Sequence, residues 1–375
     1  MSIHKMKWRF LSVLALALGL VISSCNKEPL DGPREASITE KPQDIEVDVF
    51  ALPEVVKINN QATLAFGNLE HFKTTLSSIA EMNSTALNKW EKNMRFVSMR
   101  NEFERIEDRY ENISTQQQLD QFRDNYRHKV KFTGDGDIEM IVDMYHVGSM
   151  LNTEGIVKIG GMVQKFTADK VISIVDSDLS KLALAETLTE TDLEQNIFIS
   201  PINTSSTNAR SSGPDALDCE SNWDSDNRRV KMSLDVDWWS TPNQNCAWQW
   251  VSVWNGQMYI YDWQYVCVPT GTYNITCNME LEVKSQKKGF LGIAFGSKAD
   301  IEAKYGANVH ELNGSSTINH WMPVSASETD EKKLVRSYPV DFAANVPGSA
   351  IVDYCFGPTH VAGIINSGTN CHVFH

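Results

Sequence analysis

The first 25 residues constrain this chain more than any other segment, because they set an export signal apart from the part that folds. Three basic residues precede an uncharged apolar stretch, Phe10–Ile22, and small residues then lead directly to Cys25. The apolar stretch is too short to cross a bilayer of about 30 Å as a helix, which is typical of a cleaved signal. We therefore expect residues 1–24 to be removed before the remainder folds.

The position of Cys25 predicts a bacterial lipoprotein, whose cysteine carries a diacylglyceryl group and usually an N-acyl chain. Several acyl chains on one residue hold a protein stably to a membrane. Residues 26–28 lack the aspartate that retains some lipoproteins at the inner membrane. We expect a lipid anchor in the outer membrane with the protein at the cell surface, and a periplasm-facing position is the alternative. An ordinary secretory signal beside an unrelated cysteine is the competing interpretation.

Composition divides the remaining chain into segments. Residues 25–50 are rich in Pro, Glu, Asp and Lys and predict a flexible tether. Residues 200–218 are rich in Ser, Thr, Asn, Gly and Pro and predict a linker between an α+β domain at 51–199 and a β domain at 219–375. The formal net charge of −14 repels phosphate backbones, so nucleic acid is not an expected partner.

Hydrophobic periodicity in the first domain changes from the helical period to the strand period. Helical spacing begins after Asn68, and Ser84 is a candidate cap for a second helix. The apolar positions of the predicted helices are Leu69, Phe72, Leu76 and Ile79, then Leu87, Trp90 and Met94, then Met99, Phe103, Ile106 and Tyr110, continuing near Leu119, Phe122 and Tyr126. Alternation then predicts a small antiparallel meander whose first strand is Val147–Leu151.

Part of this domain resembles a family of uncharacterised Bacteroidota lipoproteins. The similar features are a helix led by Phe72, the Trp90-Glu91 pair, the Phe-x-Ser segment at residues 96–98, and the glycine-containing hairpin at 151–160. The resemblance covers about residues 55–200. It implies a domain of unknown function, and the family brings no catalytic residues with it.

Short strands dominate the second domain, and they predict a β-sandwich. The predicted strands are Val230–Trp239, Trp248–Trp254, Met258–Val268, Thr272–Val283, Ser349–Cys355 and Cys371–Phe374. The dipeptide Asn255-Gly256 predicts a tight turn between two of them.

Six cysteines lie in this second domain, which is consistent with an oxidising compartment and up to three disulfides. They are Cys219, Cys246, Cys267, Cys277, Cys355 and Cys371. The sequence leaves 15 connectivities open. We favour Cys355 with Cys371 and Cys246 with Cys267, because each pair lies on neighbouring predicted strands. Zinc is the alternative, although the sequence has no C-x-x-C pair.

The second domain also contains most of the tryptophans. They are Trp223, Trp238, Trp239, Trp248, Trp250, Trp254, Trp263 and Trp321. Alternate positions Tyr259, Tyr261, Trp263 and Tyr265 lie on one face of a strand. Because Trp238 and Trp239 are adjacent, one of them faces away from the core in a strand. These six residues are our candidate ligand-binding set, since exposed aromatic rings stack on the C–H faces of sugars. The competing interpretation is that this face fills the core.

Signatures of catalysis and of metal binding are absent from the sequence in the forms that motifs reveal. Asp224-Ser225-Asp226-Asn227 begins like a calcium loop, but no closing Glu follows. Residues 135–137 also begin like a calcium loop, and the closing Glu is again missing. There is no G-x-S-x-G, P-loop or dinucleotide motif. We therefore predict no cofactor, no metal and no catalytic residue, while a carboxylate pair for hydrolysis cannot be recognised from sequence.

These observations favour a cell-surface lipoprotein with a non-catalytic binding role, in which the aromatic β domain binds a glycan or a glycoprotein. Two other hypotheses stay open. One is an adhesive or structural protein that binds other surface proteins, and the second is an exported hydrolase that uses two carboxylates.

Overall fold

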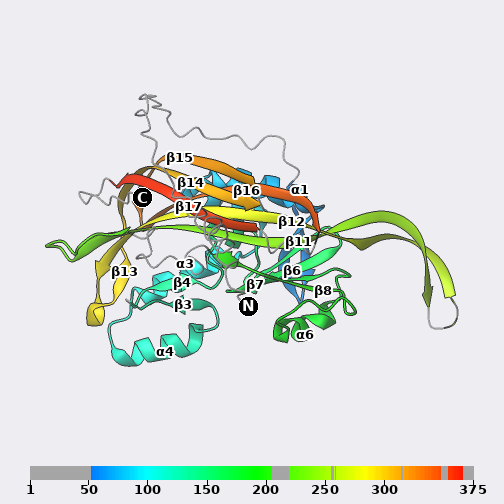
Figure 1. Cartoon of the computed structure of the whole chain (residues 1–375). Coiled ribbons are helices and arrows are strands. Elements are labelled where there is room, and N and C mark those ends of the chain that lie inside the picture. Colours follow the sequence, from blue (N-terminus) through cyan, green and yellow to red (C-terminus); the bar gives the residue numbers. More distant parts are fainter. Residues whose placement is uncertain are drawn as a thin grey trace, which may run out of the picture. The chain divides into compact units, whose positions relative to one another are not determined.

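In a computed structural model of the chain, structure is described for residues 52–134, 136–204, 219–254, 257, 259–313, 316–347 and 354–365. These residues belong to one compact unit, Phe50–His375. The fold is mixed α+β, is mostly strand, and contains several antiparallel sheets (Figure 1). The predicted signal, Cys25 and the tether lie outside the described residues.

The predicted helical block is present as four helices, and polar side chains define where each one begins. They are α1 (Leu69–Ala80), α2 (Ser84–Met94), α3 (Met99–Tyr110) and α4 (Gln116–Tyr126). Asn68 caps α1 by accepting the backbone N–H of His71. The cap of α2 is Asn83 rather than the predicted Ser84, which is the first helical residue. Thr115 starts α4 with a capping box, so the predicted continuation of the third helix is a separate helix.

The first sheet is built mainly from hairpins that follow the helices. Its order is β1-β2-β5-β6-β7-β8, and only the β2–β5 pair is parallel. The strands are β1 (Glu54–Ile58), β2 (Gln61–Phe66), β5 (Ile156–Ile159), β6 (Met162–Phe166), β7 (Lys170–Ile174) and β8 (Ile197–Pro201). A 3-10 turn, η1 (Leu179–Lys181), and helix α6 (Leu182–Thr187) connect β7 to β8.

A separate hairpin of β3 (Val130–Phe132) and β4 (Ile138–Met140) precedes the short helix α5 (Tyr145–Gly148). The prediction of a strand at Val147–Leu151 is wrong, because the chain there completes α5 and then turns. Every residue from Tyr145 to Asn152 is buried. A run that is buried on all sides lacks the alternation that separates a strand from a helix.

The second half of the chain is organised by two very long antiparallel strands, β11 (Arg228–Trp254) and β12 (Tyr259–Lys288). Shorter strands pair along the two: β9 (Asn203–Thr204) and β10 (Cys219–Glu220) on β11, and β13 (Ala294–Gly296) and β16 (Lys333–Pro347) on β12. A turn, η2 (Phe290–Gly292), precedes β13. A further sheet has the order β15-β14-β17, from β14 (Ala299–Asn313), β15 (Ser316–Glu331) and β17 (Tyr354–Ile365). Mostly antiparallel β structure is therefore confirmed, whereas a sandwich is not.

One hydrophobic cluster contains residues from both halves of the chain. It includes Leu76 of α1, Phe103 of α3 and Trp239 of β11, and the rings of Phe166 and Trp239 meet nearly perpendicularly at 5.5 Å. The domain limits 51–199 and 219–375 stay a prediction. Residues 205–218 of the predicted linker lie outside the described part, and its beginning is ordered in β8 and β9.

The cysteines do not support a domain stapled by three disulfides. Cys277 is fully buried as a thiol, and its register partners on β11 and β16 are Trp238 and Val340 rather than cysteines. It therefore packs as a small apolar side chain. Cys246 and Cys267 are register partners, and antiparallel partners lie at Cα separations that a disulfide tolerates, so that pairing stays a prediction. Cys371, the predicted partner of Cys355, lies outside the described residues.

A buried arginine connects the helices. Arg100 is fully buried and makes a two-pronged contact with Glu91 through Nε and Nη2. The same guanidinium donates to Glu104 at 2.7 Å and to the Tyr145 hydroxyl at 2.8 Å. Burial disfavours its charge, but the neighbouring Tyr145, Glu91 and Glu104 more than compensate, so the pKa of Arg100 is raised. Three segments, α2, α3 and α5, therefore depend on one cation.

Replacing Arg100 with Met leaves Glu91 buried without its counter-charge. We expect the free energy of unfolding to fall by about 3–5 kcal/mol, measured by urea unfolding followed by circular dichroism. The matched control is Arg105→Met, because Arg105 is 56% exposed and only 4.0 Å from Glu102, a pair expected to contribute about 1 kcal/mol or less. Equal effects of the two substitutions would show that this buried contact does not hold the helices.

Candidate functional site

The far end of the β11–β12 hairpin forms what we call the arm, residues 244–254 paired with 259–269. Strand β16 pairs with β12 only at residues 272–284 of β12. Strands β9 and β10 pair with β11 only at positions that precede residue 239. Among the described strands, none pairs with either edge of the arm. Figure 1 shows the hairpin extending past its neighbouring strands. The register shifts between Pro242 and Gln244, and this irregularity marks the base of the arm.

Register places the aromatic residues of the arm on one face. Trp250 is opposite Trp263 and Trp248 is opposite Tyr265. Directly opposed residues of an antiparallel pair share a face, and so do alternate residues of one strand. We call this the aromatic face, and its aromatic residues are Trp248, Trp250, Trp254, Tyr259, Tyr261, Trp263 and Tyr265.

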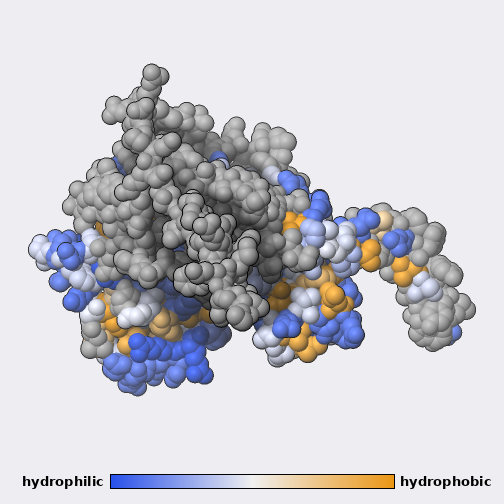
Figure 2. All heavy atoms as spheres, in the orientation of Figure 1, coloured by the Kyte–Doolittle hydropathy of each residue, from blue (hydrophilic) through white to orange (hydrophobic). Residues whose placement is uncertain are grey.

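The other face of the arm mixes polar and apolar residues, and most of its described side chains are exposed to solvent. Asn245, Ala247 and Gln249, at the intervening positions, are exposed. Figure 2 shows hydrophobic residues beside hydrophilic ones along this part of the hairpin. The aromatic residues of the arm are therefore confined to one face of the ribbon.

The predicted binding residues do not all lie together. Four of them lie on the aromatic face, namely Tyr259, Tyr261, Trp263 and Tyr265. The other two, Trp238 and Trp239, precede the register shift and lie outside the arm. Trp239 is 1% exposed, and a surface ligand cannot reach such a side chain. Trp239 is therefore excluded from the candidate site, and Trp238 is partly exposed.

Sequence reasoning missed that Trp248, Trp250 and Trp254 belong to the same face. The signal was present, because these residues occupy alternate positions before the Asn255-Gly256 turn, and a tight turn fixes the register of its two strands. The turn itself lies outside the described residues, but the opposition of Trp254 and Tyr259 defines the pairing on both sides of it.

A second feature, which no sequence pattern indicated, is a polar cavity of about 210 Å³ beside the part of β11 and β12 that lies outside the arm. Its floor is a ladder of three register pairs, Lys231 with Lys284, Ser233 with Glu282, and Asp235 with Glu280. The rest of its lining comes from α3, from β4, from the segment between β4 and α5, from the first residue of α5 and from β16. These residues are Phe103, Ile138, Glu139, Met140, Asp143, Tyr145 and Lys333. We call this the charged cavity.

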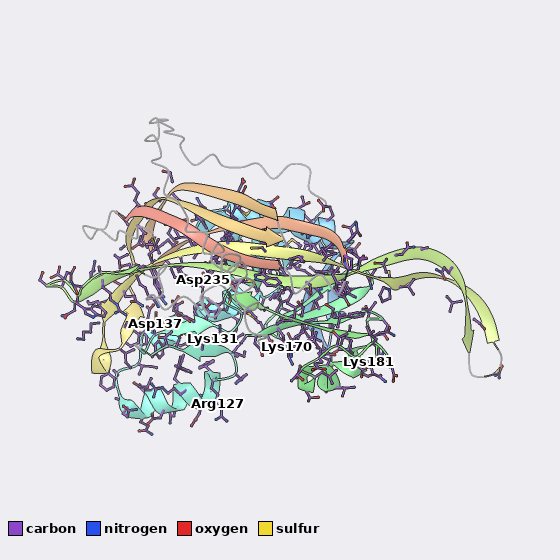
Figure 3. The ribbon with its side chains drawn as sticks, viewed as in Figure 1. Arg127, Lys131, Asp137, Lys170, Lys181 and Asp235 are labelled. Carbon is purple, nitrogen blue, oxygen red and sulfur yellow. The ribbon has the colours of Figure 1, made fainter. Side chains whose placement is uncertain are left out.

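Buried charges surround the charged cavity. Lys284 lies 2.6 Å from Asp137 and 3.5 Å from Glu107. Burial alone would lower the pKa of Lys284, but these carboxylates outweigh it and raise the pKa above its ordinary value. Figure 3 labels Asp235 on β11 together with Lys131 and Asp137 on the β3–β4 segment.

Burial raises the pKa values of two carboxyl groups of the lining. Burial raises the pKa of Glu280 to about 8, although Ser337 and the Tyr145 N–H donate to its oxygens at 2.6 and 2.7 Å. Burial, together with the nearby Asp143, raises the pKa of Glu139 to about 7. Ser337 also contacts Nδ1 of His146 at 2.6 Å.

The metal-site candidates of the sequence act as turns where they are described. Asp224 accepts the backbone N–H groups of Asp226 and Arg228 at 2.9 and 2.8 Å, so its carboxylate closes a polar turn. Within the described part of the chain, no group of three or more His, Cys, Asp or Glu residues is arranged to hold a metal ion. No described helix is long and apolar enough to cross a membrane.

Comparisons with known proteins found little similarity. No family model matches the sequence, and no curated protein matches it. Among solved structures, the chain is similar to a DUF4848 family protein from Bacteroides thetaiotaomicron, with 13% identity and a TM-score of 0.28. The match covers 81% of this chain and 99% of that one.

The raised pKa of Glu280 makes stability depend on pH. Between the ordinary carboxyl pKa of 4.5 and a value of about 8, the folded protein keeps a proton that the unfolded chain has released, so the free energy of unfolding falls as pH rises. We expect Glu280→Gln, which removes this titration, to be more stable than the wild type at pH 9, with the difference shrinking toward pH 5.

Thermal unfolding at several pH values measures this effect, and Glu54→Gln at an exposed position of β1 is the control. A constant difference between Glu280→Gln and wild type from pH 5 to pH 9 would contradict the assignment.

Proposed function

We propose that this protein is a lipid-anchored protein of the bacterial surface that binds glycans without catalysis, through the aromatic face of the arm. The observation that carries the proposal is the register of β11 and β12, which gathers seven aromatic residues on one face of a hairpin. The partners in this proposal are the membrane, through the lipid on Cys25, and a glycan or glycoprotein.

The spacing of the aromatic face suits an extended oligosaccharide. Alternate residues of a strand are roughly 7 Å apart, so the stretch from Trp248 to Trp254 spans roughly 20 Å. Rings at this spacing offer successive apolar platforms for the C–H faces of several sugar units. Tyr hydroxyls and Trp N–H groups add hydrogen-bond donors at the rims of these platforms.

A ribbon face is better suited to binding than to hydrolysis, because an arm of two strands has no walls to enclose a reacting bond. The adhesive alternative keeps one argument in its favour. Both edges of the arm lack a described partner strand, and unpaired strand edges can add a strand from another protein.

A double substitution tests the aromatic face. We expect W250A/W263A, which removes one opposed pair, to weaken glycan binding by about tenfold or more, since stacking on one aromatic side chain is worth about 1 kcal/mol or more. The measurement is a glycan array followed by titration of the best glycan, with the full-length protein in a sugar-free detergent.

The matched control is Q249A/Q264A, the adjacent opposed pair on the other face, which should bind as the wild type does. W250F/W263F should recover part of the affinity, because phenyl rings still stack. Unchanged binding by W250A/W263A would rule out the aromatic face. Absence of any glycan ligand, combined with protein crosslinks that form through the arm on intact cells, would establish the adhesive alternative.

The anchor has its own test. We expect Cys25→Ser to leave the chain without acyl groups, so that it is recovered in the soluble fraction rather than with outer membranes. Protease accessibility of the wild type on intact cells then distinguishes the cell surface from the periplasmic face. Membrane association that persists in Cys25→Ser would contradict the lipid anchor.

A further inference from the structure

The charged cavity lies on the same two strands as the arm but is separate from it. Its floor pairs lie at residues 231–235 and 280–284, whereas the arm begins beyond the register shift at Pro242. Two sets of residues with different chemistry are therefore carried by one ribbon.

The lining of the cavity calls for a polar occupant. The residues that line it carry five carboxyl groups, three ammonium groups and two hydroxyl groups around about 210 Å³. Empty cavities in proteins are apolar, and polar ones contain water or a ligand that satisfies the lining groups. A ligand with many hydroxyl groups can replace water here, because each hydroxyl both donates and accepts hydrogen bonds.

The lining carries charged groups of both signs, which favours a neutral ligand. The carboxylates of Asp143, Asp235 and Glu282 line the same volume as three lysines. One of these lysines, Lys284, is already paired with Asp137 and Glu107. An added anion meets these carboxylates, and an added cation meets the lysines.

The donors are already held in place. The Lys333 ammonium lies 4.8 Å from the ring centre of Phe103 and 4.7 Å from that of Tyr145, so two aromatic rings fix its position. The Lys231 ammonium lies 3.9 Å from the carboxylate of Glu139, which also lines the cavity. Hydrogen bonds from such charged groups are stronger than neutral ones, and fixed donors lose little freedom when a ligand binds.

The volume of the cavity restricts the size of the ligand it can hold. A volume of about 210 Å³ is below the roughly 300–1,000 Å³ of pockets for drug-sized molecules. We propose that the charged cavity binds a single neutral sugar unit, at a site distinct from the aromatic face. The cavity then recognises one monosaccharide, while the aromatic face binds longer chains.

Calorimetric titration of the full-length protein in a sugar-free detergent tests this assignment. The probes are glucose, galactose, mannose and N-acetylglucosamine, with glucuronate and glucosamine as charged relatives. We expect at least one neutral sugar to bind, and both charged sugars to bind about tenfold more weakly or worse. Binding of no neutral sugar, or tighter binding of either charged one, would overturn the proposal.

Substitutions place the binding in the cavity. Asp235→Asn keeps the shape and removes a charged acceptor, so we expect about ten- to a hundredfold weaker binding. Ser233→Leu puts an apolar side chain on the floor and should abolish binding. Asp226→Asn, at an exposed position before β11, is the control and should bind normally. Wild-type affinity in both cavity variants would overturn the proposal.

A variant of the arm distinguishes binding in the charged cavity from binding on the aromatic face. W250A/W263A should bind the monosaccharide as the wild type does, because the arm contributes nothing to the lining. Loss of monosaccharide binding in W250A/W263A would place that binding on the aromatic face and overturn the cavity assignment. Thermal unfolding of every variant confirms that it is folded.

Discussion

The pairing of β11 with β12 is the constraint on which the rest of the structure depends. It runs from Arg228 opposite Lys287 to Trp254 opposite Tyr259, whereas most strands have about five or six residues. A two-stranded ribbon is marginally stable in water by itself, so it must be covered. Outside the arm, β16 pairs along β12, and ion pairs join the ribbon to α3 and to the β3–β4 hairpin. Beyond Gln244 no described strand pairs with it, and one pairing therefore produces both a core and an arm.

Buried charges hold the N-terminal segments against this ribbon. Lys284 of β12 binds Asp137 beside β4 and Glu107 of α3, and Arg100 connects α2, α3 and α5. Burying an ion costs several kcal/mol unless its partners are well placed. Such contacts add little net stability, but any arrangement that separates the partners leaves a buried charge uncompensated and is strongly destabilised. They therefore fix which face of the ribbon the helices cover, and with it the position of the charged cavity.

The sequence was most informative where a local pattern decides the structure. Asn68 and the helical spacing after it identified α1, and the turn at Asn255-Gly256 identified the hairpin. It was least informative where tertiary contacts decide. Val147 lies in a fully buried run, and such a run has no period to read. The charged cavity joins residues from Phe103 to Lys333, and no motif brings them together.

Two tryptophans show why composition alone could not separate the core from the arm. Trp239 and Trp250 lie on the same strand in similar sequence surroundings. Trp239 packs against Phe166 of the first sheet and belongs to the core. Trp250 faces Trp263 on a part of the ribbon that no described strand joins. The strands that pair beside the ribbon end near the register shift between Pro242 and Gln244, so Trp239 lies in the flanked part of the ribbon and Trp250 lies in the arm. One strand thus carries both a tryptophan of the core and the tryptophans of the arm, and only tertiary packing tells them apart.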